Sequence, residues 1–134
     1  MLQFLITFET KFAYDLKRTI YMVNRSVLIV RAKEPFRQWL RSLPDPEDAS
    51  LAEINEDNSV YLIPEYEDDS EKEKILKMMY EEIFEEQLED WWRDEDDWPK
   101  NRNMSLFKNW FDVEFHSVVI DLVGGELISE EYQI

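Results

Sequence analysis

The sequence predicts a single α+β domain, with a small α/β domain as the nearest alternative. A chain of 134 residues with 44% apolar residues can bury one ordinary hydrophobic core. Apolar residues recur at helical spacing in some segments and form compact β-branched runs in others, so helices and strands should alternate. We therefore expect a single mixed sheet of about three to four strands packed against one long helix and about two to three short helices.

Residues 1–21 differ in composition from the rest of the chain. Their formal charge is +1, against −17 for residues 22–134. They match a secretory signal poorly, because no basic region precedes the apolar part and acids interrupt it. The alternation of apolar residues between Leu2 and Phe8 is typical of an extra strand. The change in composition instead favours an N-terminal extension upstream of the true start, with a single acidic domain beginning at Met22.

The segment that follows predicts a strand and then a helix. RSVLIVRA, residues 25–32, is a β-branched run whose continuous apolar stretch indicates a strand covered on both faces. Pro35 then stands in a first helical turn, where its missing N–H costs nothing. Apolar residues follow at helical spacing until Pro44. We expect a short helix with one buried face over about residues 34–43.

A second short helix and a second strand come next. Ser50 and Glu53 form a capping box, which predicts a short helix through about Asn55. SVYLIPEY, residues 59–66, has the composition of a strand that ends at Pro64. The order of elements in this half of the chain is therefore strand, helix, short helix and strand.

The longest predicted helix begins at Ser70, whose hydroxyl can cap the N–H of Glu73. Apolar residues then keep three-and-four spacing through Trp91, so they share a stripe that should face the core, with Ile83 and Phe84 at its centre. The opposite face carries like charges at i, i+4 spacing, which cost a few tenths of a kcal/mol per pair. Its two rows are Glu81, Glu85 and Glu89 in one, and Glu82, Glu86 and Asp90 in the other.

The C-terminal third predicts a short helix and a hairpin. The helix covers about residues 104–111, and DVEFHSVVIDLV, residues 112–123, is the longest expected strand. Gly124 and Gly125 can make a tight turn, which would return the chain through a further strand at residues 126–129.

Charge and composition exclude several classes of function. With 31 acids against 15 bases the formal net charge is −16, so phosphate backbones and anionic membranes are repelled and direct nucleic-acid binding is not expected. No apolar run approaches the roughly 20 residues of a membrane-spanning helix. Cysteine is absent, which removes thiolate catalysis and fits a cytoplasmic location. The only two glycines lie at one turn, so no phosphate-cradling loop is present and no cofactor is expected.

The acidic residues are concentrated in one segment. Residues 65–97 contain 16 acids and 4 bases, a local charge of −12. The simpler interpretation is a solvated face kept soluble by repulsion. The functional interpretation is a docking surface for a basic protein, in which tryptophans beside the acidic loop supply apolar anchors. The candidate partner-binding residues are Glu82, Glu86, Asp90, Trp92, Asp94, Asp96 and Trp98.

The only histidine of the chain offers an alternative. Asp112, Glu114 and His116 alternate along a predicted strand, so they point to one face. The outer two lie about 13 Å apart on a straight strand, too far to close on one ion without bending. An adjacent pair could still share a metal with a ligand from elsewhere in the fold. The main hypothesis is a noncatalytic interaction or regulatory protein, and a small enzyme or metal-dependent module centred on His116 is the alternative.

Three stretches together resemble a group of small acidic bacterial proteins of uncharacterised function. They are PEYEDDSEKEKIL, EEIFEEQLEDWWRDEDDWPKNR and LFKNWFDVEFHSVVIDL. The combination of EEIFEEQL, WP and WFDVEFHS is specific, and the likeness runs from about Met22 to Leu122. The resemblance implies no activity, ligand or catalytic residue. It does imply a start near MVNRSVLIV, which leaves the first 21 residues as this chain's departure from the pattern.

Overall fold

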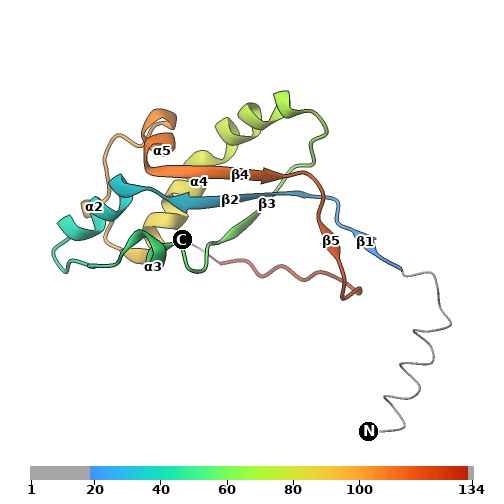
Figure 1. Cartoon of the computed structure of the whole chain (residues 1–134), viewed down its shortest axis with the longest axis horizontal. Helices are drawn as coiled ribbons and strands as arrows, with labels where there is room; N and C mark the ends of the chain where they lie inside the picture. The colour runs from blue at the N-terminus through green and yellow to red at the C-terminus, as the bar shows by residue number, and fades with distance from the viewer. Residues whose placement is uncertain (1–18, 133–134) are drawn as a thin grey trace, which may run out of the picture.

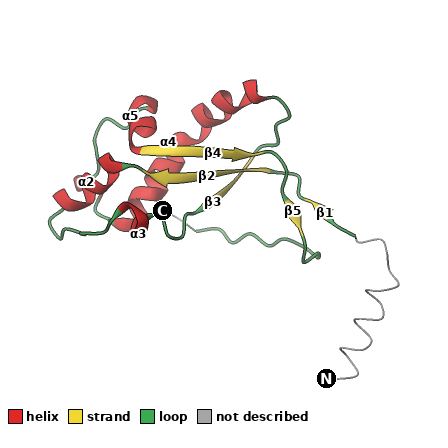
Figure 2. Cartoon of the chain, in the orientation of Figure 1, coloured by secondary structure: helices red, strands yellow, loops and turns green. Residues whose placement is uncertain are grey.

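The computed structural model describes residues 19–132, which form an α+β fold with helices on one face of a small sheet (Figures 1 and 2). The predicted fold class is confirmed. The extra strand considered between Leu2 and Phe8 lies outside the described residues. The elements are β1 (Tyr21–Met22), β2 (Ser26–Ala32), α2 (Glu34–Ser42), α3 (Leu51–Ile54), β3 (Val60–Ile63), the 3-10 turn η1 (Asp69–Glu71), α4 (Lys72–Trp91), the 3-10 turn η2 (Glu95–Asp97), α5 (Met104–Trp110), β4 (Phe111–His116) and β5 (Ile120–Asp121).

The main sheet has three strands in the order β3-β2-β4, and both pairings are antiparallel. Val27 lies opposite Leu62 on one side and opposite His116 on the other, which fixes the register of the central strand. The expected mixed sheet is therefore wrong in its strand directions. Spacing of apolar residues identifies strands, but it does not encode the direction in which a neighbouring strand returns.

Burial alternates strictly along β2, so the sheet is covered on one face only. Leu28, Val30 and Ala32 are buried beneath the helices, whereas Val27 and Ile29 on the other face are half-buried. The prediction that both faces are covered was wrong, because the helices lie on a single side. The open face keeps apolar side chains because β2 is the central strand, with neighbours on both of its sides.

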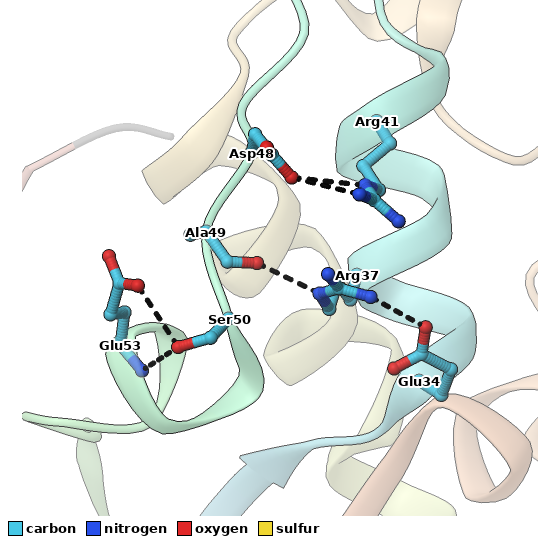
Figure 3. Close-up of polar contacts among 7 residues, drawn as sticks. All are labelled: Glu34, Arg37, Arg41, Asp48, Ala49, Ser50 and Glu53. Carbon is cyan, nitrogen blue, oxygen red and sulfur yellow. Dashed lines mark hydrogen bonds and ion pairs between the residues drawn. The ribbon is translucent and has the colours of Figure 1, made fainter.

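Side-chain contacts fix α2 against the loop that follows it (Figure 3). Arg37 donates from Nε to the carbonyl of Ala49 at 3.0 Å and pairs with Glu34 at 2.9 Å. Arg41 pairs with Asp48 at 3.0 Å. Because the guanidinium of Arg37 satisfies a backbone carbonyl, the loop returns close beside the helix and leads directly into α3.

The predicted start of α3 is confirmed. Ser50 is the N-cap residue and its Oγ accepts the backbone N–H of Glu53 at 3.1 Å (Figure 3). The hydroxyl of Ser50 also donates to the carboxylate of Glu53 at 3.1 Å. Asn55, just after the helix, bonds through its side chain to both backbone groups of Ala32, so α3 is held to the end of β2.

Helix α4 starts differently from the prediction. Asp68, rather than Ser70, is the capping residue, and it caps the 3-10 turn η1 that leads into α4; its carboxylate accepts the N–H of Ser70 at 3.0 Å. The carboxylate of Glu71 accepts the N–H groups of Glu67 and Asp68 at 3.0 and 3.1 Å, and these bonds lower its pKa. Aspartate caps a helix as well as serine does, so the first turn, η1, forms earlier in the chain.

The buried stripe of α4 is confirmed and forms much of the core. Ile83, Phe84 and Leu88 are buried. The ring of Phe84 contacts those of Phe107 and Phe111 at centroid distances of 5.7 and 5.5 Å, so one side chain joins the long helix to α5 and to β4. This aromatic cluster holds the helical layer against the sheet.

A two-stranded ribbon extends from the end of the sheet, where β1 pairs with β5 (Figure 1). The expected long strand is interrupted at Ser117, whose carbonyl accepts the hydroxyl of Ser26 at 2.9 Å. No strand forms at residues 126–129, because Gly124, with φ of 77°, ends the ribbon and β5 pairs with β1 instead. Tyr21 belongs to β1, so the expected domain boundary at Met22 falls inside a strand.

Candidate partner-binding groove

A cavity of about 410 Å³ lies between edge strand β3 and helix α4. One wall is the strand, and the other is formed by two successive turns of the helix. Tyr132, from the C-terminal segment, lies at its border and is 74% exposed. We call this cavity the β3–α4 groove; its lining residues are Ser59, Val60, Tyr61, Leu62, Ile63, Met79, Glu82, Ile83, Glu86 and Tyr132.

The strand and the helix run in opposite directions along the groove. At one end the hydroxyl of Tyr61 donates to the carboxylate of Glu86, and Nε2 of Gln87 donates to the same hydroxyl at 2.8 Å. At the other end Leu62 and Met79 border a neighbouring hollow together. Higher residue numbers on β3 therefore face lower numbers on α4. The groove is built on two regular elements, which gives it a fixed geometry.

The hydroxyl of Tyr61 stays protonated well beyond the usual range for tyrosine. Burial is the largest cause of its raised pKa, and the hydrogen bond to Glu86 is the second. A phenolate here would stand beside a carboxylate in a poorly solvated place, which both effects disfavour. Tyr61 thus acts as a fixed donor that orients Glu86 at the wall of the groove.

The two acidic rows of α4 differ in what surrounds them. In the row of Glu81, Glu85 and Glu89, Glu85 pairs with Arg102 at 3.5 Å and Glu89 with Arg93 at 3.6 Å. In the row of Glu82, Glu86 and Asp90, no member has a basic side chain within ion-pair distance among residues 19–132. We call this second row the unpaired row. Its first two members line the groove, so the uncompensated charge lies beside an apolar surface.

The strand side of the groove is apolar and exposed. Val60 and Leu62 are 58% and 57% exposed, and they project from the face of the sheet that the helices leave open. They lie opposite Ile29 and Val27 of β2, which continue the apolar strip across the open face. Apolar surface next to unpaired charge has the composition of a protein-binding site, in which apolar contacts give affinity and charge gives orientation.

The two tryptophans proposed as surface anchors have a structural role instead. Trp98 is only 4% exposed and its Nε1 donates to the carbonyl of Trp92 at 2.7 Å. Trp92 is half-buried against the core, and its Nε1 donates to the carboxylate of Asp97 at 3.0 Å. The backbone carbonyl of Asp97 accepts Nε1 of Trp39 at 2.9 Å. The expectation that Trp98 is an accessible anchor is therefore wrong, because the exit loop folds its indole inward.

Asp94 and Asp96 lie in the same loop and are exposed. The carboxylate of Asp94 accepts the N–H of Asp96 at 3.1 Å and caps η2. The backbone carbonyl of Asp96 accepts Nζ of Lys100 at 2.8 Å. Neither aspartate lines the β3–α4 groove, so the structure separates them from Glu82 and Glu86.

The residues of the alternative site lie on the open face of β4. His116 and Glu114 form a pair with 3.0 Å between Nε2 and Oε2, and Arg31 lies 3.4 Å from the same oxygen. Contact with His116 is the largest cause of the lowered pKa of Glu114. Asp112 instead pairs with Lys33, with 4.0 Å between its Oδ1 and Nζ of the lysine. Among the described residues no group of three or more histidine, aspartate or glutamate side chains is placed to hold a metal ion.

The sequence did not identify the strand residues of the groove as part of a binding surface. Val60, Tyr61 and Leu62 were identified only as part of a strand, and Met79 only as part of the apolar stripe of the long helix. One signal was available, since Pro64 directly after the strand is typical of a sheet edge, where an unpaired side can face solvent. Which helix would lie beside that edge was not visible in the sequence.

Within the described part of the chain, no helix has both the length and the apolar character needed to cross a membrane. No family model, curated protein or solved structure matches this chain. The chemistry of the β3–α4 groove is therefore the basis for assigning a function.

Proposed function

We propose that this chain is a noncatalytic cytoplasmic interaction or regulatory protein that docks a basic protein through the acidic face of α4. One observation carries the proposal. Glu82, Glu86 and Asp90 have no basic neighbour at ion-pair distance among the described residues, and the first two border an apolar groove. A partner with complementary charge would supply the missing cations.

The charged and the apolar parts of this surface have different roles in binding. Unpaired carboxylates raise the local concentration of a basic partner and accelerate association by about tenfold or more at low salt. Exposed charges alone give little affinity, because each ion pair in water contributes only about 0–1 kcal/mol. The exposed side chains of Val60 and Leu62 supply the apolar contact that the charges lack. The docking surface is therefore the unpaired row together with the groove.

The test compares two variants with the same change in net charge. E82Q/E86Q/D90N neutralises the unpaired row, and E81Q/E85Q/E89Q neutralises the neighbouring row on the same helix. Each variant and the unaltered chain would be immobilised and exposed to extract of the source cell at low and at high salt. Bound proteins would then be identified. At about 0.15 M salt the screening length is about 8 Å, so contact with a row can be separated from long-range attraction.

We expect a basic protein to be captured by the unaltered chain at low salt and released at high salt. It should be lost from E82Q/E86Q/D90N and largely retained by E81Q/E85Q/E89Q. Equal loss from both variants would mean that only net charge matters, which contradicts a site at the groove. His116→Ala serves as a further control, because His116 lies on the opposite edge strand. If this change abolished capture, the site centred on His116 would become the better hypothesis.

A further inference from the structure

We infer that the partner contributes an extended segment that adds to the free edge of β3 as a further antiparallel or parallel strand, with basic and apolar residues in alternation. The inference rests on the proposed function and specifies how the partner binds. Three features of the groove support it: the exposed strand edge, the spacing of the carboxylates, and the apolar strip on the open face.

The outer edge of β3 is available for pairing. In the order β3-β2-β4 it has a strand on one side only, and no backbone hydrogen bond joins Val60–Ile63 to another described segment on the other side. Every second residue of an edge strand directs its N–H and C=O groups outward. Four residues span about 13 Å, enough to pair with a short segment of a partner.

The spacing of the unpaired row matches an extended chain. Glu82 and Glu86 lie one helical turn apart, a rise of about 6 Å along α4. In a strand, side chains on one face recur about every 6.6 Å. Because β3 and two turns of α4 line the same groove, a strand laid beside β3 would also pass along the helix. Its helix-facing residues at every second position would then meet successive carboxylates, which selects lysine or arginine there.

The intervening residues of the bound segment would face the other side of the sheet. There they would continue the strip formed by Val60 and Leu62, which already lie opposite Ile29 and Val27. Cross-strand neighbours on one face favour apolar and β-branched pairs. The segment should therefore carry residues such as valine or isoleucine between its basic residues. Tyr132 lines the groove and is 74% exposed, and among the described residues no backbone hydrogen bond joins it to β3.

The experiment uses synthetic peptides and the full chain. The first peptide alternates lysine and valine, and the second has the same composition with all lysines preceding all valines. A third carries N-methyl groups on the backbone nitrogens of the lysines of the first sequence, and a fourth carries them on those of the valines, so only one of the two blocks the N–H groups that face β3. Affinity would be measured at low and at high salt, with E82Q/E86Q/D90N and E81Q/E85Q/E89Q as the matched pair of variants.

The alternating peptide should bind about tenfold more tightly than the block peptide, because a block peptide in the same extended form would place some valines beside the carboxylates and some lysines beside the apolar strip. One of the two N-methylated peptides should lose about the same factor and the other should bind like the parent. Hydrogen exchange gives an independent measure. The amides of β3 that face outward should be protected when the alternating peptide is bound and not when the block peptide is bound.

The outcomes separate the inference from the function on which it rests. If alternating and block peptides bind equally, and both require the unpaired row, the docking function stands and strand addition is wrong. The same conclusion follows if neither N-methylated peptide binds more weakly than the first peptide. If no basic peptide binds in a salt-dependent way, or if both triple variants bind as the unaltered chain does, the docking function and the inference are both wrong.

Discussion

Two acidic regions follow one another in the chain, and they serve different purposes. In the exit loop, carboxylates and indoles bond to one another: Asp97 accepts an indole N–H from Trp92 at 3.0 Å, and Trp98 is buried. On α4, the carboxylates of the unpaired row form no ion pair among the described residues, and Glu86 accepts a hydrogen bond from Tyr61. Both regions look alike in composition. The carboxylates and indoles of the loop stabilise the fold, whereas the carboxylates of the unpaired row have no basic partner among the described residues.

The comparison shows that acid density does not by itself indicate a docking surface. The useful distinction is whether a carboxylate already has a donor. Asp94 caps η2 by accepting a backbone N–H, and Asp97 accepts an indole N–H, so each carboxylate already has a hydrogen-bond donor. Glu82 and Asp90 are exposed and have no basic partner among the described residues. Substitutions in the exit loop should therefore change stability, whereas substitutions in the unpaired row should change binding.

The largest expected effect is on stability, at Trp98. Replacing Trp98 with alanine should reduce the free energy of unfolding by about 3–5 kcal/mol, because a buried indole is removed and the carbonyl of Trp92 loses its donor. Denaturant unfolding monitored by circular dichroism would measure it. A loss below about 1 kcal/mol would show that the loop is not a structural unit, and the contrast between the two regions would disappear.

A smaller loss is expected at Asp97. Asp97→Ala should cost about 1–3 kcal/mol, because the half-buried N–H of Trp92 is left without its charged acceptor. Asp97→Asn keeps an acceptor oxygen and should cost less. The same unfolding measurement serves, and tryptophan fluorescence should report a change in the surroundings of the indole. Equal costs for the two substitutions would indicate that the side-chain oxygen is not the stabilising group.

The hydrogen bond of Tyr61 predicts a pH dependence at the groove. Because the pKa of Tyr61 is raised above 10.0 in the folded chain, its contribution to stability is complete below pH 10.0 and declines as the pH rises from there toward the folded pKa. Glu86→Gln should lower that pKa, since one of its causes is the charge of Glu86. Phenolate absorbance during alkaline titration, compared with that of Tyr61→Phe, would identify this tyrosine. If Tyr61 of the unaltered chain titrated with the pKa of an ordinary tyrosine, its hydrogen bond to Glu86 would be contradicted.

The smallest change in stability is expected for the unpaired row. E82Q/E86Q/D90N should leave the free energy of unfolding unchanged or raise it by several tenths of a kcal/mol, because a row of like charges is removed and glutamine at residue 86 can still accept from Tyr61. Thermal unfolding at two salt concentrations would measure it, and the difference between variant and parent should shrink at high salt. A loss above about 1 kcal/mol would mean that this row, like the exit loop, is needed for folding.

Local periodicity allowed the helices to be predicted more reliably than the sheet. The buried stripe around Phe84 and the cap at Ser50 follow from spacing within one segment, and both are confirmed. The choice of Asp68 over Ser70 as the capping residue of η1, the turn that leads into the long helix, is a competition between two good capping residues, which sequence alone does not decide. Strand direction and the pairing of β5 with β1 depend on contacts between distant segments.

The candidate site was predictable only in part, for the same reason. The acidic row is visible in the sequence because its members are four residues apart on one helix. The wall supplied by Val60 and Leu62 comes from a segment about 20 residues earlier, and nothing local indicates that it lies beside this row. The burial of Trp98 was also hidden, because a tryptophan between acids and proline fits an exposed loop as well as a folded one.

The position of the unpaired row beside an open strand edge has a consequence for the behaviour of this protein at high concentration. Exposed edges of a sheet are templates for aggregation, since two identical edges can join through their backbones. Two copies meeting at β3 would bring Glu82 and Glu86 of each chain close to the same carboxylates of the other. Repulsion between these carboxylates would then oppose pairing of identical chains, and acidification or high salt would weaken that repulsion.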